Sequence, residues 1–317
     1  MKDVGVVYLY RFAEGESPVR RFLDTYRNHR AGMDHDFNVV FKGFPDRDSL
    51  ARGSALFEGF PINAIEHDDV DFDIGSYRFA ANLVVNRRLI FLNTFSQIQA
   101  DNWLAHFRRA LDVPRVGIAG ATGSWLASGA HLEGAFKHLL DKMRGSLTNL
   151  PRPSQGNEAG NACSAEQRGQ RPIFRYLFAP AEYLLKLYEY GRFPNPHIRT
   201  NAFMMERERF LSLNFSRLET KSDVYKFESG RRSMTKQILE RKLAPVVVDR
   251  NGKVYGVSEW KSSATFWIDE QANLIIADNR TSDYAEADWW MRQRLENLAW
   301  VRPWDWTSSR ADSSGVA

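Results

Sequence analysis

Three stretches decide the fold class of this 317-residue chain: VGVVYLY (4–10), SPVRRFLDTY (17–26) and FNVVF (37–41). The first is a short apolar run, which is typical of a strand buried on both faces. The second opens with a serine N-cap and a proline, and its apolar residues recur at helical spacing, so it predicts a helix. The third is again strand-like. A strand, a helix and a strand at this spacing predict a parallel crossover unit, and therefore an α/β protein.

The same alternation continues toward the middle of the chain. We expect a helix over 77–85, a strand at RLIFL (88–92), a helix along 103–111 and a strand at VGIA (116–119). Ligands of open parallel sheets bind beyond the carboxyl ends of the strands. The segments expected at that edge are 10–12, 42–44, 93–95 and 120–125.

The second half of the chain is less regular. Residues 145–170 are rich in Ser, Asn, Gln, Gly and Pro, so they predict a mobile insertion in which Cys163 is inert. The apolar stretch 173–190 predicts packed helices; the alternative is a surface that receives a lipid-linked or membrane-bound substrate. The remaining expected elements are a strand over 198–205, a helix over 232–241, a strand over 245–248, a last helix over 287–298 and a frayed tail over 308–317.

Composition narrows the class of protein. Hydrophobic residues make up 43% and charged residues 26%, and there is a single cysteine, which excludes a disordered chain and a disulfide scaffold. No apolar run approaches the roughly 20 residues of a membrane span, and the N-terminus predicts no signal peptide. Lys and Arg total 43 against 39 Asp and Glu, an excess too small by itself to indicate nucleic-acid binding. Because the positive charge is not concentrated in one segment, we expect no nucleic-acid partner. We expect a cytoplasmic protein, either free or at the inner face of the membrane.

Three groups of residues carry a resemblance to a known family. They are VVYLYRF (6–12) with RRFLDTY (20–26), DIG (73–75) with AAN (80–82) and LIFLNTF (89–95), and NAFMM (201–205) with RERF (207–210). This ordered set resembles a GT-A-type glycosyltransferase, close to the large family of bacterial nucleotide-sugar enzymes that build polysaccharides. The resemblance implies a GT-A-like (Rossmann-like), mostly parallel central sheet flanked by helices. It also implies transfer of a sugar, with inversion, from a nucleotide-diphosphate sugar to a glycan or lipid-linked acceptor in bacterial surface polysaccharide synthesis.

The resemblance also suggests how the chain is divided. The expected parts are a nucleotide-sugar-binding half (1–125), an insertion with a disordered loop and apolar helices (126–196), an acceptor and catalytic half (197–250), and a C-terminal helical extension that covers the cleft (251–317). Within the extension, the polar cluster 278–284 either folds over the donor as a lid or forms a surface loop.

The catalytic candidate is Glu228, within KFESGRR (226–232). Inverting transfer needs a carboxylate that takes the proton of the attacking hydroxyl. We expect a helix to begin near Ser229 and Gly230, so that Glu228 projects from its N-terminus. The alternative is a glutamate placed there only because the helix macrodipole favours it.

The resemblance and the expected strand ends supply the binding candidates. The expected donor-binding residues are Tyr10, Arg11, Lys42, Asp73, Gly75, Asn93, Thr94, Arg231 and Arg232. The expected acceptor or sugar-binding residues are Trp125, as a stacking wall, with Arg199 and Asn201. The alternatives are a solvated helix face for the two consecutive arginines and a satisfied turn around Arg199.

The chain departs from the family at its metal motif. Where the family carries Asp-x-Asp, this chain has Asn93-Thr94-Phe95, and an amide oxygen is a weak ligand without charge. We therefore expect no metal ligands and no required cofactor, with Lys42, Arg199, Arg231 and Arg232 stabilising the leaving diphosphate instead. The acidic run 66–73 is interpreted as a solvated loop apart from Asp73; the rival interpretation is that Asp71 or Asp73 restores a metal site. The missing motif also keeps open a non-catalytic nucleotide-sugar or glycan-binding module.

Overall fold

The computed structural model describes residues 2–127, 184–215 and 218–301. The predicted mobile insertion at 145–170 with its Cys163, the first part of the apolar stretch 173–190 and the predicted tail 308–317 lie outside the described residues.

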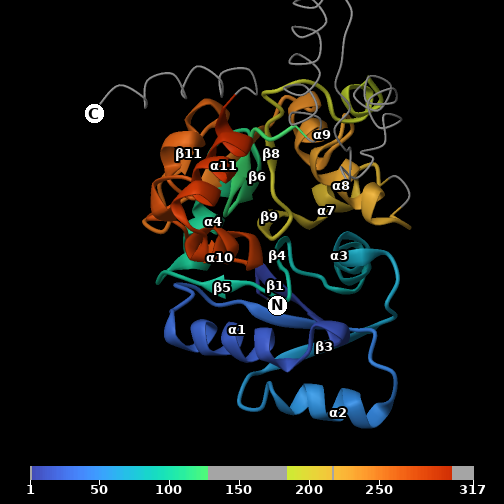
Figure 1. Cartoon of the computed structure of the whole chain (residues 1–317). Coiled ribbons are helices and arrows are strands. Elements are labelled where there is room, and N and C mark those ends of the chain that lie inside the picture. The colour runs from blue at the N-terminus through green and yellow to red at the C-terminus, as the bar shows by residue number, and fades with distance from the viewer. Residues whose placement is uncertain (1, 128–183, 216–217, 302–317) are drawn as a thin grey trace, which may run out of the picture.

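A central sheet of eight strands has the order β11-β10-β6-β9-β4-β1-β2-β3 (Figure 1). Its strands are β1 (Val4–Arg11), β2 (Asp36–Lys42), β3 (Ile62–His67), β4 (Arg88–Leu92), β6 (Val116–Gly120), β9 (Ala202–Glu206), β10 (Ala244–Val248) and β11 (Val254–Tyr255). Strands β3, β2, β1 and β4 pair in parallel, as do β6 and β10, whereas β9 runs antiparallel between β4 and β6. The predicted α/β class with a mostly parallel central sheet is confirmed. The parts expected at 1–125 and 197–250 both contribute strands to this one sheet.

Helices and short strands accompany this sheet, including a helical segment at residues 184–190. The helices are α1 (Glu16–Asn28), α2 (Arg47–Ala55), α3 (Phe72–Leu83), α4 (Trp103–Asp112), α7 (Arg207–Leu211), α8 (Lys221–Ser229), α9 (Met234–Glu240), α10 (Asn279–Glu286) and α11 (Trp289–Trp300). The short strands β5 (Gln97–Ile98) and β12 (Ile276–Ala277) pair with each other, as do β7 (Gly123–Ser124) and β8 (His197–Ile198). No helix within the described ranges has both the length and the apolar composition that a membrane crossing requires.

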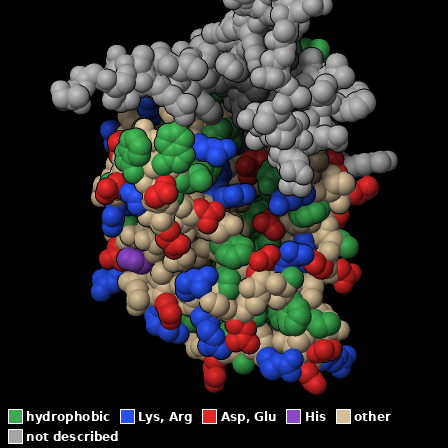
Figure 2. All heavy atoms as spheres, viewed as in Figure 1, with side chains coloured by type: hydrophobic (Ala, Val, Ile, Leu, Met, Phe, Trp, Pro, Cys, Tyr) green, Lys and Arg blue, Asp and Glu red, His purple; other side chains and the backbone are tan. Residues whose placement is uncertain are grey.

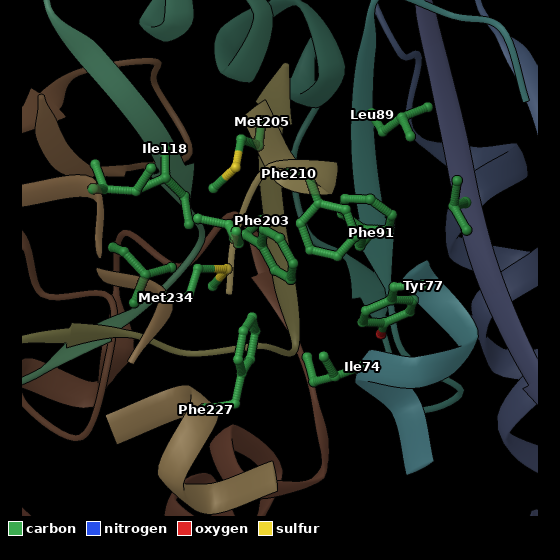
Figure 3. Close-up of a cluster of buried hydrophobic side chains, with 14 of the residues drawn as sticks. Ile74, Tyr77, Leu89, Phe91, Ile118, Phe203, Met205, Phe210, Phe227 and Met234 are labelled. Atoms are coloured by element: carbon green, nitrogen blue, oxygen red, sulfur yellow. The ribbon is translucent and has the colours of Figure 1, made fainter. Parts of the chain in front are cut away.

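Each face of the sheet is covered by its own core, because side chains alternate along a strand. On one face Val4, Val6 and Tyr8 of β1 pack with residues of α1 and α4. On the other face Val7 and Leu9 belong to a core that takes residues from α3, α7, α8 and α9. Figure 3 shows the aromatic side chains of this second core meeting between the strands and the helices. The second core therefore fixes α3 and α8 on the same side of the sheet.

Several sequence predictions need correction. The strand predicted over 198–205 is two strands, β8 and β9, because the polar residues 199–201 between them bind partners outside the sheet. The helix predicted over 77–85 begins at Phe72 and ends at Leu83. The helix predicted to begin near Ser229 and Gly230 does not do so: α8 ends at Ser229, and α9 begins only at Met234 after its Ser233 N-cap.

Candidate functional site

Polar side chains gather at the carboxyl ends of β1 and β2, where parallel sheets bind their ligands. Arg11 and Lys42 are the last residues of these two strands and lie opposite each other in the parallel register. Thr94 follows the neighbouring strand β4, and its Oγ1 donates to the carbonyl of Leu9 at 2.8 Å. The three predicted donor-binding segments therefore do meet at one edge of the sheet.

Arg11 closes the loop after β3 onto this edge. Its Nε and Nη2 donate to Oδ1 and Oδ2 of Asp69, both at 2.8 Å, and its Nη1 donates to Glu14 at 3.2 Å. The hydrogen bonds from Arg11 lower the pKa of the Asp69 carboxyl. The acidic run was expected to be solvated apart from Asp73, but the structure gives Asp69 a bidentate partner. Because 36% of the Arg11 side chain is exposed, the pair is open to exchange with another anion.

Lys42 lies beneath the same loop and is 1% exposed. Its Nζ donates to the carbonyl oxygens of Val70 and Phe72, each at 2.6 Å, which ties the start of α3 to β2. Burial lowers the pKa of the Lys42 ammonium, and the carboxylate of Asp73 opposes that change. Lys42 thus places a buried positive charge under the strand ends.

Asp73 is the point at which the two sides of the site approach each other. Burial raises the pKa of Asp73, the cations Lys42 and Arg11 oppose that rise, and the negative charge of Glu228 adds to it. Glu228, 155 positions later in the sequence, thus makes a minor contribution to the pKa of Asp73. Gly75 makes the tight start of α3 possible, because a Cβ there would lie 2.1 Å from that of Asp71.

The segment that replaces Asp-x-Asp is used to build a turn. The side-chain oxygen of Asn93 accepts hydrogen bonds from the Phe95 N–H and the Ser96 hydroxyl, each at 3.1 Å. The described residues also contain no group of three or more His, Cys, Asp or Glu side chains that could hold a metal ion. The residues at this position therefore do not fit the divalent metal that the resemblance implies.

Glu228 faces this edge from the last turn of α8, not from a helix N-terminus. A carboxylate at a helix C-terminus is disfavoured by the macrodipole, so both sequence interpretations of its local setting are wrong. The residue is held instead by Thr200, whose N–H donates to Oε2 at 3.0 Å and whose hydroxyl donates to the same oxygen. Thr200 was not singled out from the sequence, although it lies between Arg199 and Asn201, which were both expected to bind the acceptor or sugar.

Residues 195–201, which include the two-residue strand β8 and are called the 195–201 loop, are anchored by buried hydrogen bonds. The Asn195 side chain donates to the carbonyl of Ser229 at 2.7 Å, and the N–H of Ile198 donates to the Thr235 hydroxyl at 2.8 Å. His197 Nδ1 lies 2.9 Å from the carbonyl oxygen of Asn195. Burial lowers the pKa of His197, while the charge of Glu228 opposes that change. The loop is thus fixed to both ends of the α8–α9 turn.

Arg199 connects this loop to the C-terminal part of the chain. Its Nη2 lies 2.9 Å from Oδ2 of Asp278, and the two side chains are 12% and 1% exposed. The guanidinium also lies 4.5 Å from the ring centre of Phe266. Asp278 is the N-cap of α10 and accepts from the N–H of Thr281 at 2.9 Å. The polar cluster at 278–284 therefore forms a capped helix that is joined to the loop by a buried ion pair.

Three other predicted binding residues have side chains that contact the rest of the protein. Tyr10 is 2% exposed and packs edge-on against Phe44, so its ring belongs to the core. The indole of Trp125 donates to the carbonyl of Val257 at 3.1 Å and packs against Trp300, rather than forming an open wall. Asn201 is buried; its side-chain oxygen accepts from Thr122 at 2.9 Å, and its Nδ2 has no hydrogen-bond partner among the described residues.

The predicted cations have different partners. Arg199 pairs with Asp278 and Lys42 with backbone carbonyls, whereas Arg231 and Arg232 are exposed. On the face drawn in Figure 2, basic and acidic side chains are interspersed, as the near balance of 43 and 39 charges predicts. Among the predicted donor-binding cations, Lys42 and Arg11 are the two whose charges lower the pKa of Asp73.

A cavity of about 410 Å³ lies beside the strand ends. It is lined by Phe41, Phe44, Asp46, Arg47, Leu50, Glu66, His67, Asp68, Val70 and Phe79. The residues on either side of Asp69 contribute to its wall, so the cavity adjoins the Arg11–Asp69 pair. Its aromatic rings and carboxylates could receive a planar ring that carries N–H groups.

Comparisons with known proteins do not show a family for this chain. No family model matches the sequence, and no curated protein matches it. Among solved structures, similarity is found to the mannosyltransferase PcManGT of Pyrobaculum calidifontis in complex with GDP-Man and Mn²⁺ (15% identity, 37% of this chain and 34% of that chain, TM-score 0.31). Mouse xyloside xylosyltransferase 1 is similar at 13% identity over 66% of this chain and 69% of that chain, with a TM-score of 0.32. The WbbM bifunctional glycosyltransferase is similar at 14% identity over 67% of this chain and 34% of that chain, with a TM-score of 0.33. The chain thus spans about a third of the first and the last of these proteins, and TM-scores this low carry no argument for this chain.

Proposed function

We propose that this chain is a glycosyltransferase that moves a sugar from a nucleotide-diphosphate sugar to a hydroxyl of a glycan or lipid-linked acceptor, with inversion. The observation that carries the proposal is the Glu228 carboxylate. Thr200 holds it with two hydrogen bonds, directly before β9 enters the sheet beside β4, and its negative charge contributes to the raised pKa of Asp73. The resemblance noted in the sequence supports a role in bacterial surface polysaccharide synthesis at the cytoplasmic face of the membrane.

Glu228 would act as the general base. Both hydrogen bonds from Thr200 go to Oε2, so Oε1 is the oxygen assigned to the acceptor hydroxyl. As Oε1 takes the proton, the acceptor oxygen forms a bond to the anomeric carbon. The bond from that carbon to the diphosphate oxygen breaks, and its electron pair leaves with the diphosphate.

The leaving diphosphate needs positive charge, and Arg11 and Lys42 would supply it. Arg11 can exchange Asp69 for a phosphate because both are bidentate acceptors for a guanidinium. Lys42 is already buried and fixed, so its charge acts without reorganisation during the reaction. This proposal assigns no step to a divalent metal.

The nucleoside would occupy the cavity of about 410 Å³ beside the Arg11–Asp69 pair. Phe44 and Phe79 offer aromatic faces for the base, and Glu66 and Asp68 offer acceptors for its N–H groups. This placement would bring the diphosphate to Arg11 and the sugar toward Glu228.

A non-catalytic nucleotide-sugar-binding module is the second candidate. It is favoured by the use of Asn93 as a turn cap in place of a metal-binding carboxylate. Such a module would bind the donor through Arg11 and the cavity, and Glu228 would contact a sugar hydroxyl without removing its proton.

One experiment separates the two candidates. The protein is screened for thermal stabilisation against diphosphate sugars of uridine, guanosine, thymidine and cytidine, because a ligand that binds only the native state raises its melting temperature. Each stabilising donor is then incubated with glycan and lipid-linked acceptors, and the products are detected by mass spectrometry. Stabilisation with transfer supports the enzyme, whereas stabilisation without transfer to any acceptor supports the binding module. The absence of stabilisation by every donor would overturn both.

A further inference from the structure

The helical segment at residues 184–190 carries a group of exposed apolar side chains. Leu184, Leu185 and Tyr188 are 61%, 56% and 70% exposed. Single exposed leucines are common on protein surfaces, but grouped large apolar side chains mark a contact surface. In Figure 1 this segment lies at the same end of the molecule as α9.

Positive charge surrounds these apolar side chains. Arg231 lies 5.3 Å from the ring centre of Tyr188, and Lys186 lies 5.4 Å from that of Tyr190. Arg192 and Arg232 are exposed on the adjoining segments. We call the group formed by Leu184, Leu185, Tyr188, Lys186, Arg192, Arg231 and Arg232 the basic-apolar surface.

The acidic side chain on this segment does not cancel its charge. The carboxylate of Glu189 lies 2.7 Å from Nζ of Lys226, so it is already paired with another cation. Four cations of the basic-apolar surface therefore stand beside one neutralised carboxylate. A surface of this composition is complementary to a layer that has negative charge on its outside and apolar groups beneath.

The surface is attached to the part of the chain that carries Glu228. The N–H of Arg231 donates to the carbonyl of Glu189 at 2.9 Å, and Nζ of Lys236 donates to the carbonyl of Tyr190 at 3.3 Å. Because Arg231 follows Glu228 by three residues, a contact made by this surface would hold α8 close to whatever the surface binds.

We propose that the basic-apolar surface docks onto an anionic lipid bilayer. Leu184, Leu185 and Tyr188 enter the boundary between headgroups and acyl chains, and the four cations contact lipid phosphates. The leucines favour lipid over nucleic acid, because a polyanion without an apolar layer gives exposed aliphatic side chains nothing to bury against. The inference does not rest on the proposed transferase activity, although docking would bring a lipid-linked acceptor toward Glu228.

Vesicle co-sedimentation tests the inference without a sugar donor, so its result is independent of catalysis. We expect binding to vesicles of phosphatidylglycerol and phosphatidylcholine, weakening with salt, and little binding to phosphatidylcholine alone. The double variant Arg231→Gln/Arg232→Gln should bind the anionic vesicles about tenfold or more weakly, because each cation near such a surface contributes separately. The double variant Leu184→Ser/Leu185→Ser should lose most of the salt-resistant binding.

Two matched variants control for general surface changes. Leu83→Ser alters a leucine of the same exposure (57%) at the end of α3, and Arg52→Gln alters an exposed arginine on α2. Both should bind vesicles as the wild type does. Equal binding by the wild type and the two double variants, all with unchanged melting temperatures, would overturn the inference. So would binding of the wild type to RNA, or self-association through the leucines, without binding to anionic vesicles.

Discussion

The two sides of the candidate site hold their functional groups in different ways. At the strand ends, Arg11 is held by the carboxylate of Asp69 in a pair that is open to solvent. At the 195–201 loop, Arg199 is held by Asp278 in a pair that is almost fully buried. The same residue type thus forms an exchangeable ion pair on one side and a permanent one on the other. Under the proposed function, this difference suits the strand ends to accept an anion and the loop to keep Glu228 in place.

The largest expected effect comes from the carboxylate that the loop holds. Glu228→Gln should lower turnover by roughly 10²-fold or more, because it removes a general base while keeping the shape of the side chain. Donor-induced thermal stabilisation should persist, since the proposed donor contacts lie at the strand ends. Glu240→Gln, at an exposed position at the end of α9, is the control. Near-normal turnover of the Glu228 variant would remove this residue from the mechanism.

Breaking each ion pair in turn compares the two sides directly. Arg199→Met should lower the free energy of unfolding by about 3 kcal/mol, because it leaves the buried Asp278 carboxylate without the cation that balances its charge. Arg11→Met should cost about 1 kcal/mol or less, since solvent can replace the guanidinium at a partly exposed pair. Urea unfolding measures both. Similar losses for the two variants would contradict the proposed difference between the sides.

The pH dependence of stability should have opposite signs at two neighbouring aspartates. Burial raises the pKa of Asp73 above its ordinary 3.8, so its stabilising contribution is present below 3.8 and is lost as the pH rises through the folded-state pKa. Hydrogen bonds from Arg11 lower the pKa of Asp69, so its contribution is present above 3.8 and is lost as the pH falls through the folded-state pKa.

Two asparagine variants test these signs. At pH 7 Asp73→Asn should raise the melting temperature and Asp69→Asn should lower it. The first difference should shrink as the pH falls toward 3.8, and the second only as the pH falls below 3.8. Thermal unfolding of the variants and the wild type across this range is the measurement. A loss of stability at pH 7 in the Asp73 variant would mean that its attraction to Lys42 outweighs its burial.

The smallest expected effect is that of chelation. Excess EDTA should change turnover by less than about twofold, because Asn93, Thr94 and Phe95 stand where the resembled family carries Asp-x-Asp, and the Asn93 side chain is used in a turn. Activity with a stabilising donor, measured with and without EDTA, gives the answer. Complete loss that Mn²⁺ restores would mean that Asp71 or Asp73 acts as a metal ligand and that Arg11 and Lys42 do not suffice.

Local patterns predicted much of the first half of the fold. The strands at 4–10 and 37–41 occur, and the helix expected from Ser17 begins at Glu16, because the apolar period acts within a few positions. The expected serine N-cap is wrong, since Gly15 takes the N-cap position and no side chain caps this helix. Helix α8 was not predicted, and a helix start was expected where α8 ends. A signal was available, because Thr220 and Asp223 cap the start of α8 reciprocally. A helix predicted to start at Lys221 would have placed Glu228 in the last turn of that helix.

The candidate site could be predicted only in outline. The sequence placed Arg11, Lys42 and Thr94 at adjacent strand ends, since the carboxyl ends of parallel strands share one edge. It did not indicate that Arg199 would pair with Asp278, because partners 79 positions apart are chosen by packing and not by spacing. Nor did it indicate the two hydrogen bonds from Thr200 to Glu228.

The sequence by itself determined the α/β class and the parallel strands of the first half, because these follow from side-chain periods of two and 3.6 residues. It also determined that Asn93 and Phe95 stand where the resembled family carries the two carboxylates of Asp-x-Asp. Only the tertiary structure decided that β9 lies antiparallel between β4 and β6, which carries the 195–201 loop to the strand ends. The physical reason is that burial against distant elements, which no local pattern encodes, settles which polar group meets which partner.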